Sequence, residues 1–404
     1  MTPSSDIIKY CYISNISCRN LRNIKDFDVK IGCANGKPCH LLITGDNGVG
    51  KTTFVRSLYE GLKNDEGGKP LRLVKYLRKD RKLDSCVELL KNERDVNSLV
   101  SIKKYLSDLA VIPDCLSRLE YYAAVGDGDF LVFNFEANRK ENFVTPDGPR
   151  RMDVRATSKQ FIQMLVNLKT QSAFANQDNN HREVEKIEGW FARFNEALAE
   201  LLGHNDFKLE FKSKEFNFEI KERDKEPYKF TQLSDGYSAI LMMLAEIMLN
   251  MSTDPVSAYD MPGIVIIDEI ETHLHVELQK KILPFMTKFF PNLQFVVTTH
   301  SPFVLSSVSN AVIYDLGTHQ KFEDFSKFSY GNIIEGYYNE STYSNVLLSQ
   351  LDEIQNILNK DELTDEEKRL IAKFDREMDD LSAGQPLELQ NKWLTLKIKN
   401  IGKF

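Results

Sequence analysis

The chain has 404 residues, of which 42% are hydrophobic and 27% charged, an ordinary composition for a globular protein of two or three lobes. Its formal net charge of −7 argues against binding nucleic acid with the whole surface, so any such contact needs a local basic patch or a partner. No apolar run is long enough to cross a membrane and no secretion signal is recognisable, so we expect a cytoplasmic protein without membrane attachment.

The cysteines are all in the first part of the chain and have no Cys-x-x-Cys spacing. They are therefore interpreted as reduced core or surface thiols rather than as zinc ligands. The six residues are Cys11, Cys18, Cys33, Cys39, Cys86 and Cys115.

The first predicted elements are two strands with alternating apolar residues, at 10–16 and 27–31, joined by polar residues 19–23. This hairpin leads into a third apolar strand, which runs into the pattern Gly-x-x-x-x-Gly-Lys-Thr between Gly45 and Thr52. Glycines allow positive φ values and a close approach of the backbone, so that successive N–H groups can surround phosphate oxygens. The loop is therefore predicted to bind the β- and γ-phosphates of a nucleotide.

Two side chains of this loop have a predicted role of their own. Lys51 adds a positive charge to the phosphate oxygens, and the Thr52 hydroxyl, at the start of a helix, can bind Mg²⁺. The predicted nucleotide-binding residues of the loop are Gly45, Asn47, Gly48, Val49, Gly50, Lys51, Thr52 and Thr53.

Residues 60–120 have the pattern of charged helices, with a basic stretch at 72–82. Two interpretations of this stretch stay open, a solvated helix face or a patch that binds nucleic acid or a partner. The next strand, at 130–135, ends in polar residues, which is typical of the ligand edge of an open α/β sheet.

The middle of the chain is predicted to hold a loop, two helices and a hairpin. Residues 141–157 carry two prolines and several charges and indicate a loop, and apolar residues then recur at helical spacing over 161–168 and 187–202. Alternation over 207–211 and 216–220 predicts a β-hairpin.

A buried helix over 239–251 follows Leu233-Ser234-Asp235-Gly236-Tyr237, where Ser234 is a plausible N-cap. The β-branched strand after it ends in Asp268 and Glu269. Adjacent carboxylates at the end of a buried strand are costly to desolvate, so a chemical role is favoured. Asp268 is predicted to hold Mg²⁺, and Glu269 to polarise the water that attacks the phosphate.

The strand at 293–298 ends in Thr299-His300-Ser301, which places His300 where it can reach a γ-phosphate. A further strand is predicted at 311–315. The chain then becomes acidic and helical, with a polar link at 359–369 between two helices. The apolar stripes of these helices are Leu347, Leu351, Ile354, Ile357 and Leu358, and then Leu370, Ile371 and Phe374.

In this order, the motifs resemble the ABC-type P-loop ATPases of the branch that includes RecF, SMC and OLD-like proteins. The resemblance depends on five elements, which are Arg22 in the hairpin, the P-loop, the signature at 233–237, the Asp268-Glu269 strand and the switch strand that ends in His300. The chain is also similar to the stand-alone ATPases of bacterial anti-phage defence systems.

The resemblance implies an α/β fold with an ABC-ATPase core sheet, an N-terminal β-hairpin lobe, helical insertions and a helical C-terminal tail. The core is expected at 1–59, 126–140 and 206–316. A helical insertion is expected at 60–125, a helical lobe that leads to the signature at 141–205, and a helical extension at 317–404.

The resemblance also implies a head-to-tail dimer, or a higher homo-oligomer, that encloses ATP and Mg²⁺. Lys51, Thr52 and Arg22 of one subunit would bind a nucleotide that Ser234 and Gly236 of the other subunit close over. Glu269 would be the general base, Asp268 and Thr52 the metal ligands, and His300 the γ-phosphate contact.

Two functions are compatible with this resemblance. The first is an ATPase, slow without its partner, that acts as a sensor or switch for a separately encoded effector, a nuclease or toxin, in anti-phage defence. The alternative is a RecF-like repair or recombination ATPase that binds DNA itself, for which the basic stretch 72–82 is the candidate contact.

Overall fold

The computed structural model describes most of the chain in fourteen ranges, and the basic stretch 72–82 lies outside them. The described residues are 12–19, 21–22, 24–34, 37–63, 111–115, 129–137, 160–203, 207–223, 225–251, 256, 260–338, 345–360, 362–380 and 387–400. The chain divides into two compact units, Met1–Tyr330 and Gly331–Phe404.

The first unit is built on a six-stranded sheet with the order β14-β13-β5-β12-β11-β7. All neighbouring pairs are parallel except β13 and β14, which are antiparallel. This sheet, with helices on both faces, confirms the predicted α/β fold. The strands are β5 (His40–Thr44), β7 (Leu131–Phe135), β11 (Gly263–Ile267), β12 (Leu293–Thr298), β13 (Ala311–Asp315) and β14 (Lys321–Phe322).

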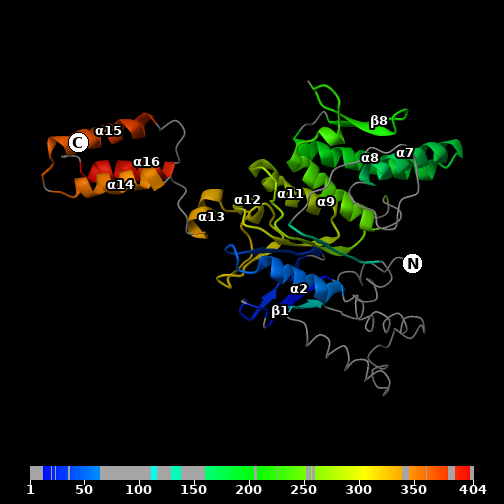
Figure 1. Cartoon of the computed structure of the whole chain (residues 1–404), viewed down its shortest axis with the longest axis horizontal. Coiled ribbons are helices and arrows are strands. Elements are labelled where there is room, and N and C mark those ends of the chain that lie inside the picture. The colour runs from blue at the N-terminus through cyan, green and yellow to red at the C-terminus, as the bar shows by residue number, and fades with distance from the viewer. Residues whose placement is uncertain are drawn as a thin grey trace, which may run out of the picture. The chain divides into compact units, whose positions relative to one another are not determined.

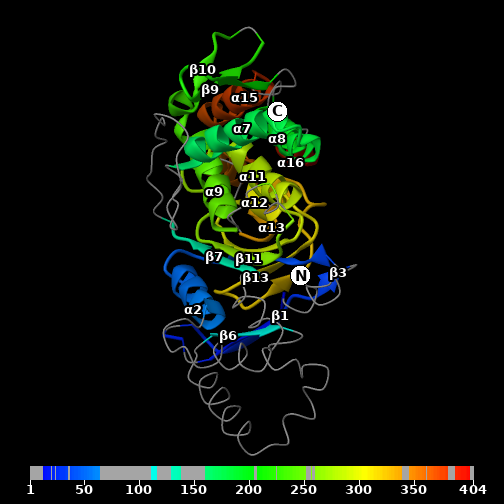
Figure 2. The same cartoon turned by 90° about the vertical axis from the view of Figure 1, so that its right-hand side faces the viewer.

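The central strands are continuous apolar runs because helices cover both faces of the sheet. Every residue of β5, β11, β12 and β13 is buried. Helix α2 (Lys51–Lys63) covers one face, whereas α9 (Asp235–Met251) and α11 (Val276–Phe289) lie on the other (Figures 1 and 2). The loop that joins β5 to α2 is therefore held between two buried elements.

The predicted N-terminal hairpin is confirmed as an antiparallel pair of strands. β1 (Ile13–Cys18) pairs with β2 (Phe27–Lys30), from Asn15 opposite Lys30 to Cys18 opposite Phe27. A third strand, β6 (Val111–Cys115), pairs with β1, so the prediction of helices through residue 120 is wrong at these residues. Val111 and Ile112 are β-branched and Pro113 disfavours a helix, while an edge strand tolerates proline. Strands β3 (Cys33–Ala34) and β4 (Lys37–Pro38) form a separate short ribbon.

The predicted helices and hairpin of the middle segment are confirmed. Helix α7 (Phe161–Gln177) packs on α8 (His181–Leu202), which begins where Asn180 accepts a hydrogen bond from the Glu183 N–H and ends at Gly203 in the left-handed conformation. The hairpin is extended to a three-stranded sheet of β8 (Lys208–Lys212), β9 (Asn217–Lys221) and β10 (Tyr228–Lys229).

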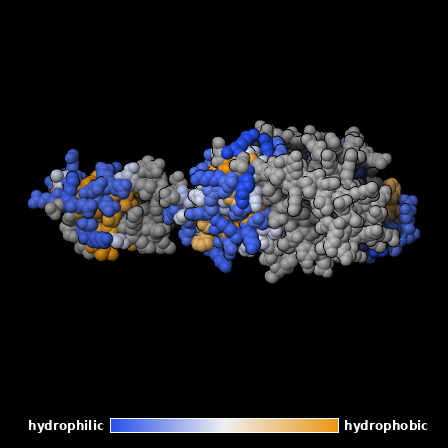
Figure 3. All heavy atoms as spheres, turned by 90° about the horizontal axis from the view of Figure 1, so that it is seen from below, coloured by the Kyte–Doolittle hydropathy of each residue, from blue (hydrophilic) through white to orange (hydrophobic). Residues whose placement is uncertain are grey.

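The second unit is helical, as expected of the C-terminal extension. Its helices α14 (Asn345–Leu358), α15 (Asp365–Asp380) and α16 (Leu387–Lys399) share one apolar core. The core residues are Leu351, Ile354, Ile357, Leu358, Ile371, Phe374, Met378 and Trp393. The predicted stripe is wrong at Leu370, which is 38% exposed, since Ile371 and Phe374 take the inward positions. Hydrophobic atoms lie among hydrophilic ones on the visible face of this unit, at the left of Figure 3.

The boundary between the two units lies after strand β14, further along the chain than residue 317, where the sequence predicts the C-terminal extension to begin. Strand β14 pairs with β13, so the residues just after 316 belong with the core sheet, and the division falls after Tyr330. The short helix α12 (Pro302–Leu305) belongs to the first unit, and α13 (Tyr330–Gly336) begins at the boundary.

Candidate nucleotide-binding site

The loop between β5 and α2 has the backbone that the glycines predict. Gly45, Gly48 and Gly50 have φ values of +125°, +82° and +106°. A Cβ on Gly50 would come within 2.9 Å of Ile24 Cδ1, and one on Gly45 within 3.1 Å of Asp315 Oδ1, whereas one on Gly48 would meet nothing within 4 Å. Two glycines thus let the loop pack against its neighbours, and the third faces open space.

Lys51 folds back over this loop. Its Nζ donates to the backbone oxygens of Gly45 at 2.8 Å and Asp46 at 3.0 Å. Burial lowers the pKa of Lys51, against the opposing effect of the nearby carboxylates, first among them Glu269. The cation is therefore held at the loop, where it can be transferred from carbonyl oxygens to phosphate oxygens.

The remaining loop residues follow the expected arrangement. Asn47 is exposed at the tip, and Val49, Thr52 and Thr53 are half-buried at the start of α2. The first turn of α2 has no acidic residue, which leaves its free N–H groups and positive dipole end available to an anion.

Arg22 lies in the turn of the N-terminal hairpin, which touches the loop. It is exposed and has a φ of +48°, in a turn closed by a hydrogen bond from the Ile24 N–H to the Leu21 oxygen at 2.9 Å. Because a Cβ on Gly50 would meet Ile24, the turn that contains Arg22 packs against the phosphate loop.

The two acidic residues after β11 are held by one side chain of β12. The Thr298 hydroxyl donates to Asp268 Oδ1 at 2.6 Å and accepts from the Glu269 N–H at 2.7 Å. Asp268 is buried, whereas Glu269 is half-buried and has a φ of +47°, unfavourable for a residue with a Cβ. The buried strand thus ends in a strained turn that presents the second carboxylate.

His300 lies beyond the end of β12, within reach of the same charges. Its backbone N–H donates to Glu271 Oε1 at 2.5 Å. Burial lowers the pKa of His300, Lys51 lowers it further, and Glu271 and Glu269 oppose this. The lowered pKa favours the uncharged ring, which can donate one hydrogen bond to a phosphate oxygen.

The strand order brings these residues together. Because β12 lies between β5 and β11, and the three strands are parallel, Lys51, Glu269 and His300 all follow the carboxyl ends of adjacent strands. The electrostatic influence of Glu269 on both Lys51 and His300 agrees with this placement.

The two signature residues differ in their surroundings. Ser234 is exposed, and its hydroxyl forms no hydrogen bond with the residues that the structure describes, so the capping interpretation finds no support. Gly236 is buried, and a Cβ there would lie 2.8 Å from Leu278 Cδ1. Glycine at 236 therefore allows α9 to approach α11, whereas Ser234 points its polar group at solvent.

Three residues of the site were not singled out from the sequence. Thr298 supports both acidic residues, Glu271 binds the His300 N–H, and Asp315 Oδ1 accepts from the N–H groups of Gly317 and Thr318 beside Gly45. Their only sequence signal is a polar residue at or just after the end of a buried strand.

The residues present fit ATP with Mg²⁺. A nucleotide-bound Mg²⁺ takes most of its ligands from phosphate and water, so one carboxylate and one hydroxyl, Asp268 and Thr52, suffice. No group of three or more His, Cys, Asp or Glu side chains in the described ranges could hold a metal without such help. Cys18 and Cys39 are buried thiols that are not part of a disulfide.

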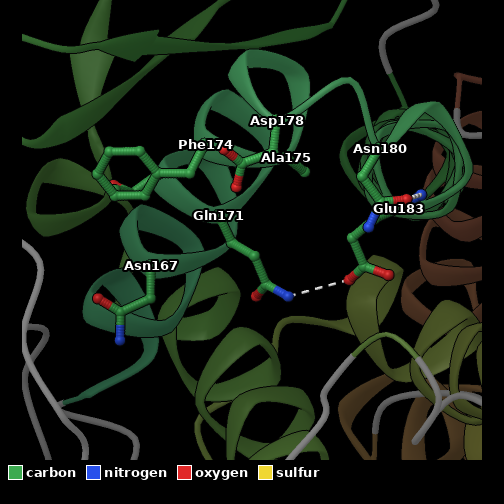
Figure 4. Close-up of a pocket in the computed structure, with 8 residues that line it drawn as sticks. Asn167, Gln171, Phe174, Ala175, Asp178, Asn180 and Glu183 are labelled. Atoms are coloured by element: carbon green, nitrogen blue, oxygen red, sulfur yellow. Dashed lines mark hydrogen bonds between the residues drawn. The ribbon is translucent and has the colours of Figure 1, made fainter.

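A second hollow lies away from this site, at the turn between α7 and α8 (Figure 4). It has a volume of about 670 Å³, and the Gln171 side chain donates to Glu183 across it at 2.9 Å. Its lining is polar except for Phe174 and Ala175, and no residue of the phosphate loop contributes to it.

Among the described helices, none combines the length and apolarity needed to cross a membrane.

Comparison with known proteins places the site in a family. Residues 41–306 match the family described as "AAA domain, putative AbiEii toxin, Type IV TA system". The chain is 42% identical to the Retron Ec83 probable ATPase of Escherichia coli over 95 residues, which are 23% of this chain and 18% of that protein. It is 34% identical over 97 residues to the Septu protein PtuA of Bacillus mycoides (strain KBAB4), covering 24% of this chain and 14% of the relative.

Longer matches are weaker. The Septu protein PtuA of Bacillus thuringiensis is 25% identical over 302 residues, 68% of this chain and 69% of the relative, whereas the retron and B. mycoides matches span less than a fifth of those proteins. Among solved structures, an SMC head bound to the C-winged helix domain of ScpA is 14% identical with a TM-score of 0.38, covering 75% of this chain and 94% of that one. The family model covers well over half of the chain, which therefore belongs to this AAA-domain family.

Proposed function

We propose that the chain binds ATP with Mg²⁺ at the loop between β5 and α2 and hydrolyses it. The observation that carries the proposal is the convergence of Lys51, Glu269 and His300 at the ends of three adjacent parallel strands. A glycine cradle, a cation and a carboxylate are groups that phosphoryl transfer to water uses, and the imidazole can add a hydrogen bond to the phosphate.

The chemistry follows from these positions. The loop N–H groups and Lys51 bind the β- and γ-phosphates and stabilise the charge that develops on their oxygens. Glu269 accepts a proton from the water that attacks the γ-phosphorus as the bond from that phosphorus to the bridging oxygen breaks. His300 donates a hydrogen bond to the γ-phosphate. Asp268 and Thr52 would hold Mg²⁺, which would supply additional positive charge to the phosphates.

Two variants test this reaction. Glu269→Gln is expected to retain ATP binding and to lower turnover about 10²-fold or more, as expected for loss of a general base. Lys51→Ala is expected to abolish binding of the nucleotide itself. Titration with a fluorescent ATP analogue and a phosphate-release assay measure the two quantities, and wild-type turnover in Glu269→Gln would show that the base is misassigned.

Closure by a second subunit is the next part of the proposal. Ser234 stands exposed at the start of α9, where helix N–H groups have no partner within the helix, and its hydroxyl is not used as a cap. A second copy could present this serine to the nucleotide in a head-to-tail dimer. Ser234→Arg should then leave ATP binding by the monomer intact while suppressing hydrolysis and ATP-dependent dimerisation in sedimentation experiments. Normal dimerisation would limit Ser234 to a local role.

The retron and Septu names of the relatives support a role in bacterial anti-phage defence. In this role, ATP-dependent closure would act as a sensor or switch that controls a separately encoded nuclease or toxin, because a partner that binds one state more tightly is regulated by that difference. Pull-down of the neighbouring gene product with and without ATP tests the interaction. DNA binding by the isolated chain would favour the repair alternative, whose basic stretch 72–82 lies outside the described residues.

A further inference from the structure

The turn that follows the two acidic residues contains a third carboxylate, Glu271, which contacts the switch strand. Its Oε1 accepts the His300 N–H at 2.5 Å. Its Oε2 is buried and accepts no hydrogen bond from the described residues. One oxygen of a buried carboxylate is thus committed to a single backbone amide, 29 residues further along the chain.

The turn itself is fixed to the end of β12. The Thr298 hydroxyl binds Asp268 and the Glu269 N–H, and the Ile270 N–H donates to the Thr298 oxygen at 3.2 Å. Within the turn, the Thr272 N–H donates to the Glu269 oxygen at 3.1 Å and the Leu274 N–H to that of Glu271 at 2.9 Å. The carboxylate of Glu271 therefore projects from a backbone with little freedom to shift.

A second contact holds the residue after His300. The Ser301 hydroxyl donates to Gln279 Oε1 at 2.7 Å and accepts from the N–H groups at the start of α12. Because Thr298 and Ser301 are both held in place, the orientation of the His300 peptide depends on the acceptor of its own N–H. That acceptor is Glu271.

We propose that Glu271 is a positioning residue for hydrolysis, which holds the backbone of His300 so that the imidazole meets the γ-phosphate. The inference rests on the proposed ATPase function. It assigns Glu271 the role of a hydrogen-bond acceptor of fixed reach; the reaction uses neither its charge nor its proton. A group displaced by about 1 Å from its productive position loses about 10²-fold in rate, so the length of this side chain matters.

Two conservative variants separate reach from charge. Glu271→Gln keeps the reach and offers a carbonyl oxygen to the same N–H, whereas Glu271→Asp keeps the charge and is one methylene shorter. The positioning role predicts that kcat falls no more than about fivefold in Glu271→Gln, since a neutral acceptor is somewhat weaker. In Glu271→Asp, kcat is expected to fall about 10²-fold. The KM for ATP is expected to stay unchanged in both, because the phosphate loop is untouched.

A third measurement tests whether Glu271 acts through His300. In a His300→Ala background, Glu271→Asp should cause no further loss, because coupled residues are not additive. Additive losses would overturn the inference, as would wild-type turnover of Glu271→Asp or a larger loss in Glu271→Gln than in Glu271→Asp. If Glu271→Asp does not fold, the test depends on Glu271→Gln alone. A fall in kcat of this folded variant as large as that of Glu269→Gln would then overturn the inference.

The same set distinguishes the failure of the inference from that of the proposed function. If Lys51→Ala and Glu269→Gln leave turnover unaltered, or the wild type does not hydrolyse ATP, the proposed function fails. If those variants behave as expected and the Glu271 variants do not, only the positioning role fails.

Discussion

Thr298→Val tests the side chain that supports both acidic residues, since it replaces the hydroxyl by a methyl group of similar size. Thr298 is fully buried and its Oγ1 forms two hydrogen bonds, of 2.6 Å to Asp268 Oδ1 and 2.7 Å with the Glu269 N–H. Valine leaves both partners without this contact, and a buried group that loses its partner costs about 1–3 kcal/mol. We therefore expect the free energy of unfolding of the first unit to fall by about 2–4 kcal/mol.

Neighbouring Thr44 provides the matched control. It is also fully buried at the end of a parallel strand, but its Oγ1 has no hydrogen-bond partner among the described residues. Thr44→Val should be nearly neutral or stabilising. The chain has two tryptophans, Trp190 in the first unit and Trp393 in the second, so Trp393→Phe in every variant leaves Trp190 fluorescence to report unfolding of the first unit in urea. Equal losses in Thr298→Val and Thr44→Val would refute the reasoning.

Two further predictions concern pH and backbone strain. Burial lowers the pKa of His40 from 6.5 to about 4, and its Nδ1 accepts the Phe295 N–H at 3.1 Å, so the folded state binds fewer protons than the unfolded state between these values. The contribution of His40 to stability should fall by up to about 3 kcal/mol as the pH drops from 6.5 to 4. His40→Gln is expected to lose this part of the slope and keep the part that His300, whose pKa burial also lowers, contributes. Exposed His181→Gln should keep the whole slope, as measured by urea unfolding at each pH. Since Glu269 has a positive φ, Glu269→Gly should be about 1 kcal/mol more stable than Glu269→Ala; equal melting would show that the turn relaxes.

Much of the core could be predicted because its signals are local. The apolar runs that became β5, β11, β12 and β13 are buried on both faces, so each is recognisable without its neighbours. The glycines of the phosphate loop have the positive φ values that their spacing predicts. The residues at strand ends, Lys51, Glu269 and His300, follow from the same pattern once parallel pairing is assumed.

What the sequence missed depends on contacts between distant segments. β6 pairs with β1 across about a hundred residues, and its short run of Val111, Ile112 and Pro113 stands within a charged segment. The sequence predicts a nucleotide contact for Gly236 but not the packing contact that requires its small size, which is with Leu278 on another helix. Thr298 and Glu271 form their bonds across 29 to 30 positions, a distance at which no periodicity is informative.

The contacts between β11 and β12 are reciprocal, and this limits how the site can respond to nucleotide. Thr298 of β12 holds Asp268 and Glu269, while Glu271 from the turn after β11 holds His300. If His300 contacts a phosphate as proposed, we expect its shift to displace the turn that carries Glu269, because packed and hydrogen-bonded segments do not deform independently. The same turn leads into α11, where Gln279 binds Ser301 and Leu278 contacts Gly236 of the signature helix. Under the proposed function, these contacts within one subunit would connect a γ-phosphate at His300 to the helix that exposes Ser234. If the chain acts as proposed, the contacts within one subunit are sufficient to carry the effect of ATP from His300 to the exposed Ser234.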